Sequence, residues 1–550
     1  MKILFEKKIF LPTIIAIFAA ALYLPALGIG FLSDDWHLLW IAKNSTQPWY
    51  AYFWTNYAGG IGGYAYRPIQ TLFFIFADFL FGANQIGFHI MQILIHAANA
   101  VLLYFLARKL FGAALPALVA AIFFAIFPNH PEAVIWNSAI GDPAAAFFSL
   151  LTWLCWLRAG ESGKLRFYLL AYFSASLALL SKDMAVSLPF IIVLWELVNW
   201  RMKTGIKKTA IRLFSVLPFF LVLIGYFFVR AQASGYLFGY YGNPRLAIDP
   251  MVAIRTFLAI PVSHFFSAAL RNQVMDYLYR VVDTRLEAFI IAFILAGILS
   301  AIRVSRRFWF ILLAFCASIV PVMQFGINHL PGRLSDEGER YAYLPSIFLA
   351  LILAIIFQKI WNRKNAVIKF ASIGAVMIIC LALSWQLFAK ISDWRSASAI
   401  AREVFLTWQT AAKSARAPVI TVGLPDNYRG VPLWRNGLNE AMELSSAKRP
   451  ENKVLALRTA IDSSHQFQME KISDQEFVYQ SSFADIVGPR EIQENGCHTS
   501  LRSPEFFVYA LTYRDFAKEA AIKCEPRTSA SSSFLFWLGD RWELVGFAAH

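Results

Sequence analysis

Apolar runs recur along the first 390 of the 550 residues, and they constrain the fold more than any other feature of the chain. Hydrophobic residues make up 58% of the sequence, and the mean hydropathy is +0.52. This pattern is typical of a polytopic all-α membrane protein and excludes a soluble one. The first run, 9–29, follows Lys2, Lys7 and Lys8, so we interpret it as an uncleaved signal anchor with a cytoplasmic N-terminus.

Basic clusters predict the topology, because Lys and Arg are retained on the cytoplasmic side of short loops. The clusters lie at 108–109, 158–166, 201–212, 303–307 and 359–369. Between them we expect hairpins whose tips face outside, in a multi-pass protein of the cytoplasmic (inner) membrane. About eleven transmembrane helices are predicted, near 9–29, 86–107, 114–128, 143–157, 167–180, 187–200, 213–229, 288–302, 308–326, 344–358 and 367–388. A shorter apolar stretch, 69–81, is expected to lie along the membrane interface.

The composition changes near residue 390, so the chain is predicted to divide there. Residues 1–390 form a transmembrane domain, and residues 391–550 form a small α+β domain on the periplasmic or extracellular side. In this second domain we expect an amphipathic helix near 393–415 and strands at 418–423, 506–513, 533–538 and 542–547. Pro, Asn and Gly predict exposed turns at 424–430, including Pro425 to Asn427, and at 433–437. Docking of an acceptor is an alternative role for them, but an exposed turn needs no further purpose.

Five cysteines add a weak constraint. Cys155, Cys316 and Cys380 lie in apolar spans, where a thiol usually acts as a small hydrophobic group. Cys497 and Cys524 occur in the tail, and an oxidising exterior would let them form a disulfide. The alternative is that both thiols are free, since two cysteines in a domain do not by themselves establish a disulfide.

Two adjacent carboxylates, Asp34 and Asp35, follow the first apolar run. One interpretation is structural: Ser33 caps a short helix, and acidic residues in the first turn complement the helix dipole. The other is chemical, because neighbouring carboxylates near a low-dielectric boundary disfavour each other's ionisation. A carboxylate in that position is suited to accept a proton from a hydroxyl group near neutral pH.

An ordered set of motifs resembles the GT-C superfamily of integral-membrane glycosyltransferases. The motifs are Phe31–Trp36, Tyr66-Arg67-Pro68, Phe88-His89 with His96 and Asn99, Phe127–Val134, Ser181-Lys182-Asp183 and Glu339–Pro345. The resemblance covers roughly residues 1–360 and is nearest to protein O-mannosyltransferases that carry tetratricopeptide repeats, and to their bacterial relatives. This chain departs from that pattern, because no such repeats follow the spans and Ile140–Pro143 lacks an expected Arg.

The resemblance implies a polyprenyl-phosphate sugar donor, transfer on the outer face of the membrane, and an acidic base in the first outside loop. By position the catalytic base is Asp34 or Asp35, and the sequence does not choose between them. In an inverting transfer the base deprotonates the acceptor hydroxyl while the lipid phosphate leaves with negative charge. The sugar and the acceptor, whether protein, glycan or lipid, are not determined by the sequence.

The departing phosphate needs cations, and Lys182, Arg340 and Arg67 stand at predicted outside tips. Arg binds phosphate bidentately, and Lys acts as a point charge, so these three are the candidate donor-phosphate residues. A structural alternative stays open, in which Lys182 pairs with Asp183, and Arg340 pairs with Glu339 or Glu337. Ionisable groups at the ends of membrane spans nevertheless favour function.

Further candidates for substrate binding are Glu132, His130 and Asp142, with Tyr343 from the last motif. Glu132 is expected to orient substrate or a cation. The His-x-Glu spacing is unspecific, so no cofactor is assigned, and a divalent cation, Mg²⁺ or Mn²⁺, is left open.

The net charge of +15 is concentrated in the cytoplasmic clusters, which favour anionic membrane lipids. No nucleic-acid module is evident. Besides a glycosyltransferase, two functions of other classes are alternatives: a transporter or flippase for lipid-linked glycans, and a non-catalytic scaffold with an outside binding domain. A transporter predicts internal inverted repeats, which the sequence does not display. A scaffold does not require acidic and basic residues gathered at the tips of short spans.

Overall fold

The computed structural model describes residues 2–55, 66–203, 212–235, 250–266, 305–323, 338–415 and 419–445, short stretches between 270 and 278, and most of 452–546. These residues divide into two compact units. The first comprises Met1–Leu27, Thr46–Ile327 and Gly338–Ile391, and the second comprises Gly28–Ser45, Asn328–Glu337 and Ser392–His550. The acidic pair, Asp34 and Asp35, therefore belongs to the second unit.

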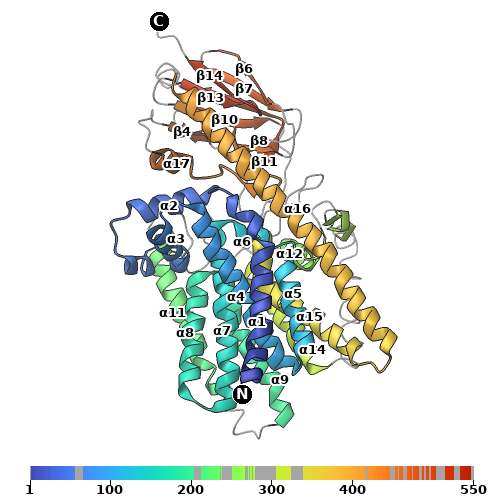
Figure 1. Cartoon of the computed structure of the whole chain (residues 1–550). Coiled ribbons are helices and arrows are strands. Elements are labelled where there is room, and N and C mark those ends of the chain that lie inside the picture. The colour runs from blue at the N-terminus through green and yellow to red at the C-terminus, as the bar shows by residue number, and fades with distance from the viewer. Residues whose placement is uncertain are drawn as a thin grey trace. The chain divides into compact units, whose positions relative to one another are not determined.

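The first unit is helical (Figure 1). Its α-helices are α1 (Lys2–Leu22), α3 (Pro68–Phe81), α4 (Gln85–Phe111), α5 (Ala114–Ile126), α6 (Pro131–Ile135), α7 (Gly141–Ser162), α8 (Leu165–Ser181), α9 (Leu188–Lys203), α11 (Leu217–Ser234), α12 (Pro250–Ser263), α14 (Arg306–Ile319) and α15 (Tyr343–Trp361). Short 3-10 helices are η1 (Leu24–Gly28, which ends at the unit boundary), η2 (Trp49–Phe53), η4 (Asn137–Ala139), η5 (Asp183–Ser187), η6 (Val320–Val322) and η7 (Glu339–Ala342). Helix α7 packs on α8 and α4, and α5 packs on α4 and α15.

Among the described residues, five helices are long and apolar enough to cross a membrane. They lie in Gln85–Phe111, Asn137–Ser162, Arg212–Ser234, Glu339–Trp361 and Ala366–Ala412, and shorter apolar helices occur at Ile9–Leu22, Pro68–Phe81, Ala114–Ile126 and Leu165–Ser181. The prediction of a polytopic helical membrane protein is confirmed at this level. The count of eleven spans stays a prediction, and the segment 288–302 lies outside the described residues.

Helix α16 (Ala366–Ala412) corrects the prediction of two separate helices. It is one continuous helix of 47 residues, where the sequence predicted a span ending at 388 and a new amphipathic helix from 393. The division into units falls within this helix, after Ile391. Neither Pro nor Gly stands between residues 388 and 393, so nothing local ends the helix where its apolar composition ends.

The second unit contains α2 (Asp34–Asn44), α17 (Leu438–Leu444) and three sheets. The strands are β1 (Val419–Val422), β2 (Leu424–Tyr428), β3 (Val431–Pro432), β4 (Asn452–Val454), β5 (Arg458–Ile461), β6 (Phe467–Lys471), β7 (Glu476–Ser481), β8 (Ile486–Gly488), β9 (Glu491–Glu494), β10 (Cys497–Arg502), β11 (Asp515–Ala517), β12 (Glu519–Cys524), β13 (Ser533–Trp537) and β14 (Trp542–Gly546). Their orders are β14-β13-β1-β4, β6-β7-β12-β10-β9 and β11-β8-β5-β2-β3.

Two exposed turns predicted in the second unit are corrected in part: residues 429–430 form a turn and 433–436 bend, but the rest differs. Pro425 to Asn427 lie in strand β2, which pairs with β5, and Asp426 is buried. The segment 433–437 is not wholly exposed either, because Leu433 and Trp434 are buried. Strand pairing and the apolar side chains overrode the local preference of Pro and Asn for turns. The expected strand at 506–513 lies outside the described residues.

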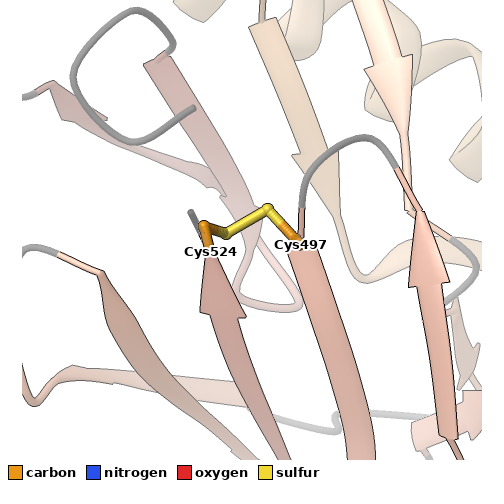
Figure 2. The surroundings of a disulfide bond; sticks show 2 residues. All are labelled: Cys497 and Cys524. Atoms are coloured by element: carbon orange, nitrogen blue, oxygen red, sulfur yellow. A yellow bond between two sulfur atoms is a disulfide. The ribbon is translucent and has the colours of Figure 1, made fainter. Parts of the chain in front are cut away.

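Cys497 and Cys524 are bonded in a disulfide (Figure 2). They face each other in the antiparallel pairing of β10 and β12, and their Cα atoms are 4.0 Å apart. The link joins two neighbouring strands of one sheet and closes a loop over a sequence separation of 27.

Candidate active site

The first unit gathers four cations and three carboxylates at the ends of its helices, among the residues that the structure describes. We call this group the cation cluster; it consists of Arg67, Lys182, Arg230, Arg340, Glu132, Asp142 and Asp183. Its members come from segments that are far apart in the sequence. Four positive charges minus three negative charges leave a net charge of +1 within it.

Lys182 forms the centre of the cation cluster. It follows the last residue of α8 in extended conformation, and its Nζ lies 2.7 Å from Asp142 Oδ2 in the first turn of α7. Only 5% of the Lys182 side chain and none of the Asp142 side chain are exposed. Gly141 permits this approach, because a Cβ there would lie 2.7 Å from the Ser181 carbonyl oxygen.

Burial lowers the pKa of Lys182 from 10.5 to about 8. The Asp142 carboxylate opposes this shift, while the positive charges of Arg67 and Arg340 add to it. The three cations selected from the sequence therefore lie close enough to act on one another. An anion placed among the three cations would relieve their mutual repulsion. This arrangement therefore favours the binding of a phosphate group.

Arg340 is held by Glu132 from two directions. Its guanidinium forms an ion pair with the Glu132 carboxylate, and its backbone N–H donates to Glu132 Oε2 at 2.8 Å. The guanidinium also lies over the rings of Trp136 and Tyr341, at 5.1 and 4.7 Å from their centroids. The Glu132 carboxylate and the two aromatic faces together fix the orientation of this cation.

Asp183, the alternative partner of Lys182 in the sequence, binds Arg230 and Tyr226 in the structure. Arg230 Nη1 donates to Asp183 Oδ2 at 3.0 Å, and the Tyr226 hydroxyl donates to Oδ1 at 3.0 Å. Burial opposes ionisation of Asp183, but the charges of Arg230 and Arg67 outweigh it and hold its pKa below the usual value. Arg230 was missed, although a lone charge near the end of an apolar span was the available signal.

Glu339, the alternative partner of Arg340 in the sequence, binds two other cations in the structure. Arg271 forms an ion pair with Glu339, and Lys390 Nζ lies 2.6 Å from both Glu339 carboxylate oxygens. All three side chains are buried. Glu337 lies outside the described residues. The sequence does not predict Arg271 and Lys390 as partners of Glu339, since nothing local ties them to position 339.

The remaining candidates take separate partners. His130 Nε2 lies 2.9 Å from the Ser346 hydroxyl, and the Tyr343 hydroxyl lies 2.7 Å from His96 Nδ1 and 3.2 Å from Asn99 Nδ2. The His130 and Tyr343 rings pack with centroids 4.5 Å apart. Within the described part of the chain, no three His, Cys, Asp or Glu side chains form a group that could hold a metal ion.

Asp34 and Asp35 differ in their surroundings within the second unit. Asp35 is 1% exposed, and its Oδ2 accepts the Leu32 backbone N–H at 3.2 Å. Asp34 is partly exposed, and its Oδ1 accepts from Asn436 Nδ2 at 2.6 Å. The predicted capping by Ser33 is wrong in detail, because Ser33 occupies the N-cap position of α2 but its side chain makes no capping hydrogen bond.

Comparison with known proteins agrees with the resemblance noted in the sequence. Residues 68–227 match the family described as dolichyl-phosphate-mannose-protein mannosyltransferase. This segment includes Glu132, Asp142, Lys182 and Asp183 of the cation cluster, and Arg230 lies three residues beyond it. The resemblance to membrane mannosyltransferases is therefore confirmed over these residues.

Individual relatives are similar over a limited part of their length. Protein O-mannosyl-transferase tmtc2 from Xenopus laevis is 31% identical over 144 residues, which are 25% of this chain and 17% of the relative. Protein O-mannosyl-transferase Tmtc2 from Drosophila melanogaster is 30% identical over 197 residues, 33% of this chain and 21% of the relative. The crystal structure of ArnT from Cupriavidus metallidurans bound to undecaprenyl phosphate is 11% identical, with a TM-score of 0.44 over 81% of this chain and 90% of that one.

Proposed function

We propose that this protein is a membrane glycosyltransferase that moves a sugar from a polyprenyl-phosphate donor to an acceptor hydroxyl on the outer face of the cytoplasmic membrane. The observation that carries the proposal is the convergence of Arg67, Lys182 and Arg340 in a chain with membrane-spanning helices. The match of residues 68–227 to a dolichyl-phosphate-mannose-dependent family supports the same donor class. The acceptor class is left unspecified.

The cation cluster is suited to the leaving phosphate. As the glycosidic bond breaks, negative charge grows on the lipid phosphate, and preorganised cations stabilise that charge. Arg340 is oriented by Glu132, and Lys182 by Asp142, so neither side chain has to be immobilised when the donor binds. We assign Lys182, Arg340 and Arg67 to the donor phosphate, and Glu132 and Asp142 to holding those cations in place.

Asp34 is the better candidate for the base. A base must reach the acceptor hydroxyl, and Asp34 is partly exposed whereas Asp35 is buried and accepts a backbone hydrogen bond. In the proposed inverting step, Asp34 takes the hydroxyl proton while the hydroxyl oxygen attacks the anomeric carbon. The carbon–phosphate oxygen bond breaks, and its electron pair leaves with the lipid phosphate.

The test is sugar transfer in membranes that contain the full chain and a labelled polyprenyl-phosphate hexose. Loss of a general base should lower the rate of Asp34→Asn by about 10²- to 10⁴-fold while donor binding remains. Asp35→Asn should keep more activity than Asp34→Asn, and Asp540→Asn, at an exposed position, should match the wild type. Wild-type rates for both Asp34→Asn and Asp35→Asn would overturn the base assignment. No transfer or hydrolysis of any labelled donor by the wild type would overturn the function.

A further inference from the structure

We infer that the segment 433–437 of the second unit positions Asp34, with Asn436 as the positioning residue. The inference rests on the proposed role of Asp34 as the base. It assigns a function to the C-terminal unit, whose purpose the sequence left open. The contacts that carry it all lie within the second unit, to which α2 belongs.

The direct contact is one hydrogen bond to the carboxylate. Asn436 Nδ2 donates to Asp34 Oδ1 at 2.6 Å, across a sequence separation of 402 residues. A neutral amide donor fixes the rotation of a carboxylate and leaves the second oxygen available for a proton.

The backbone before Asp34 is held by the same segment. The Ser33 N–H donates to the Leu433 carbonyl at 2.8 Å, and Ser33 has a φ of 49°, an unfavourable conformation for a residue with a Cβ. Gly437 has a φ of 90°, and a Cβ there would lie 2.5 Å from the Ser33 carbonyl oxygen. The close approach of these two backbones requires glycine at position 437.

Polar contacts continue this arrangement along α2 and α17. His37 Nδ1 lies 2.9 Å from Glu440 Oε1, and Trp40 Nε1 donates to Glu443 Oε2 at 2.5 Å. The spacing of three residues in each helix places these contacts one turn apart, which fixes the helices against rotation as well as sliding. The orientation of Asp34 is therefore set by several contacts, of which Asn436 is the one that touches its carboxylate.

The segment 433–437 is itself anchored in the second unit. The Trp434 indole N–H donates to the Ala401 carbonyl of α16 at 2.9 Å, and its ring stacks on Phe405 at 5.3 Å. Arg435 donates to both carboxylate oxygens of the buried Asp426, from Nε to Oδ1 at 3.1 Å and from Nη2 to Oδ2 at 2.7 Å. Asn436 thus stands on a rigid support, although its own side chain is exposed.

Exposure separates a positioning role from a packing role. The exposed Asn436 side chain buries little surface, so its removal should barely change the stability of the protein. Asn439 offers a matched control, because it is an exposed asparagine on α17 whose Oδ1 accepts from Asn452 and not from α2. Of these two asparagines, only Asn436 should affect catalysis when it is replaced.

The experiment measures sugar transfer by the full-length protein as a function of pH. Asn436→Ala should lower kcat about tenfold or more and leave the affinity for the sugar donor unchanged. It should also shift the acidic limb of the kcat profile to higher pH, because the ionised base loses a hydrogen-bond donor. Asn436→Asp should shift that limb further through like-charge repulsion, and Asn436→Gln should recover part of kcat. Asn439→Ala should behave as wild type in every measurement.

The outcomes separate this inference from the proposed function. If Asp34→Asn is inactive while Asn436→Ala and Asn436→Asp have the kcat and pH profile of wild type, the positioning role is wrong and the proposed function stands. If Asp34→Asn is fully active, the base assignment fails, and the positioning role fails with it. A fall in kcat of Asn436→Ala with an unchanged pH profile and a lower melting temperature would indicate packing and would also overturn the inference.

Discussion

At the scale of single residues, Lys182 has the most informative environment. Its ammonium group is buried beside Asp142 and within the fields of Arg67 and Arg340, and its pKa is lowered to about 8. The unfolded chain therefore binds more protons than the folded chain between about pH 8 and 10.5, so this lysine contributes stability that increases as pH rises through that window. Its charge, in contrast, is lost as pH rises above about 8.

This pKa predicts the alkaline limit of donor binding. The kcat/KM for the polyprenyl-phosphate donor should fall as pH rises through about 8, since kcat/KM reports ionisation in the free enzyme. Lys182→Arg should keep its charge and move that limit upward, although its different geometry should lower the plateau. Steady-state rates at varied donor concentration between pH 6 and 10 provide the measurement. An unchanged alkaline limit in Lys182→Arg would contradict the assignment.

The sequence predicted the phosphate candidates of the first unit but not their pairing. Lys182, Arg340 and Arg67 could be selected because charges at the ends of apolar spans are unusual, and the structure brings them together. Their counter-ions could not be predicted from neighbouring positions. Lys182 pairs with Asp142 on α7 rather than with the adjacent Asp183, because helix packing, not sequence proximity, decides which carboxylate faces it.

At the scale of elements, the helices of the first unit were easier to predict than the sheets of the second. A span needs only a long apolar run, and α4, α7 and α15 each coincide with one. A strand depends on its partner, so Pro425 to Asn427 were assigned to a turn although β2 pairs with β5. The contact of α2 with the segment 433–437 joins positions about 400 residues apart and left no pattern in the sequence.

The disulfide between β10 and β12 gives a prediction at this scale. In the chain-entropy model, closing a loop of this length should stabilise the folded sheet by about 3–4 kcal/mol. The double variant Cys497→Ser, Cys524→Ser should therefore unfold at a lower temperature than wild type, and a reductant should lower only the wild-type value. Thermal unfolding in detergent measures this, with Cys155→Ser, a free thiol in α7, as the control. Equal melting temperatures of the wild type and the double variant would contradict a stabilising bridge.

At the scale of the whole molecule, charged groups mark opposite ends of the helices in the first unit. Lys109 of α4 lies 2.7 Å from Glu161 of α7, and Arg307 of α14 donates to the Leu110 carbonyl at 2.9 Å. Asp142, in the cation cluster, stands at the other end of α7, which at 1.5 Å per residue is about 33 Å long. That length exceeds a hydrocarbon core of about 30 Å, so α7 can separate the cation cluster from the basic helix ends across a membrane.

This separation predicts the orientation of the chain. Basic helix ends are retained in the cytoplasm, so we expect the loop between α15 and α16 inside and the second unit outside. In intact cells that express a variant lacking Cys155, Cys316 and Cys380, a membrane-impermeant thiol reagent should label Asn439→Cys. The reagent should label Asn362→Cys only after permeabilisation. Because both asparagines are exposed in the structure, a difference in labelling reports the side of the membrane and not burial. Labelling of Asn362→Cys but not Asn439→Cys in intact cells would reverse the topology and place the proposed reaction on the cytoplasmic face.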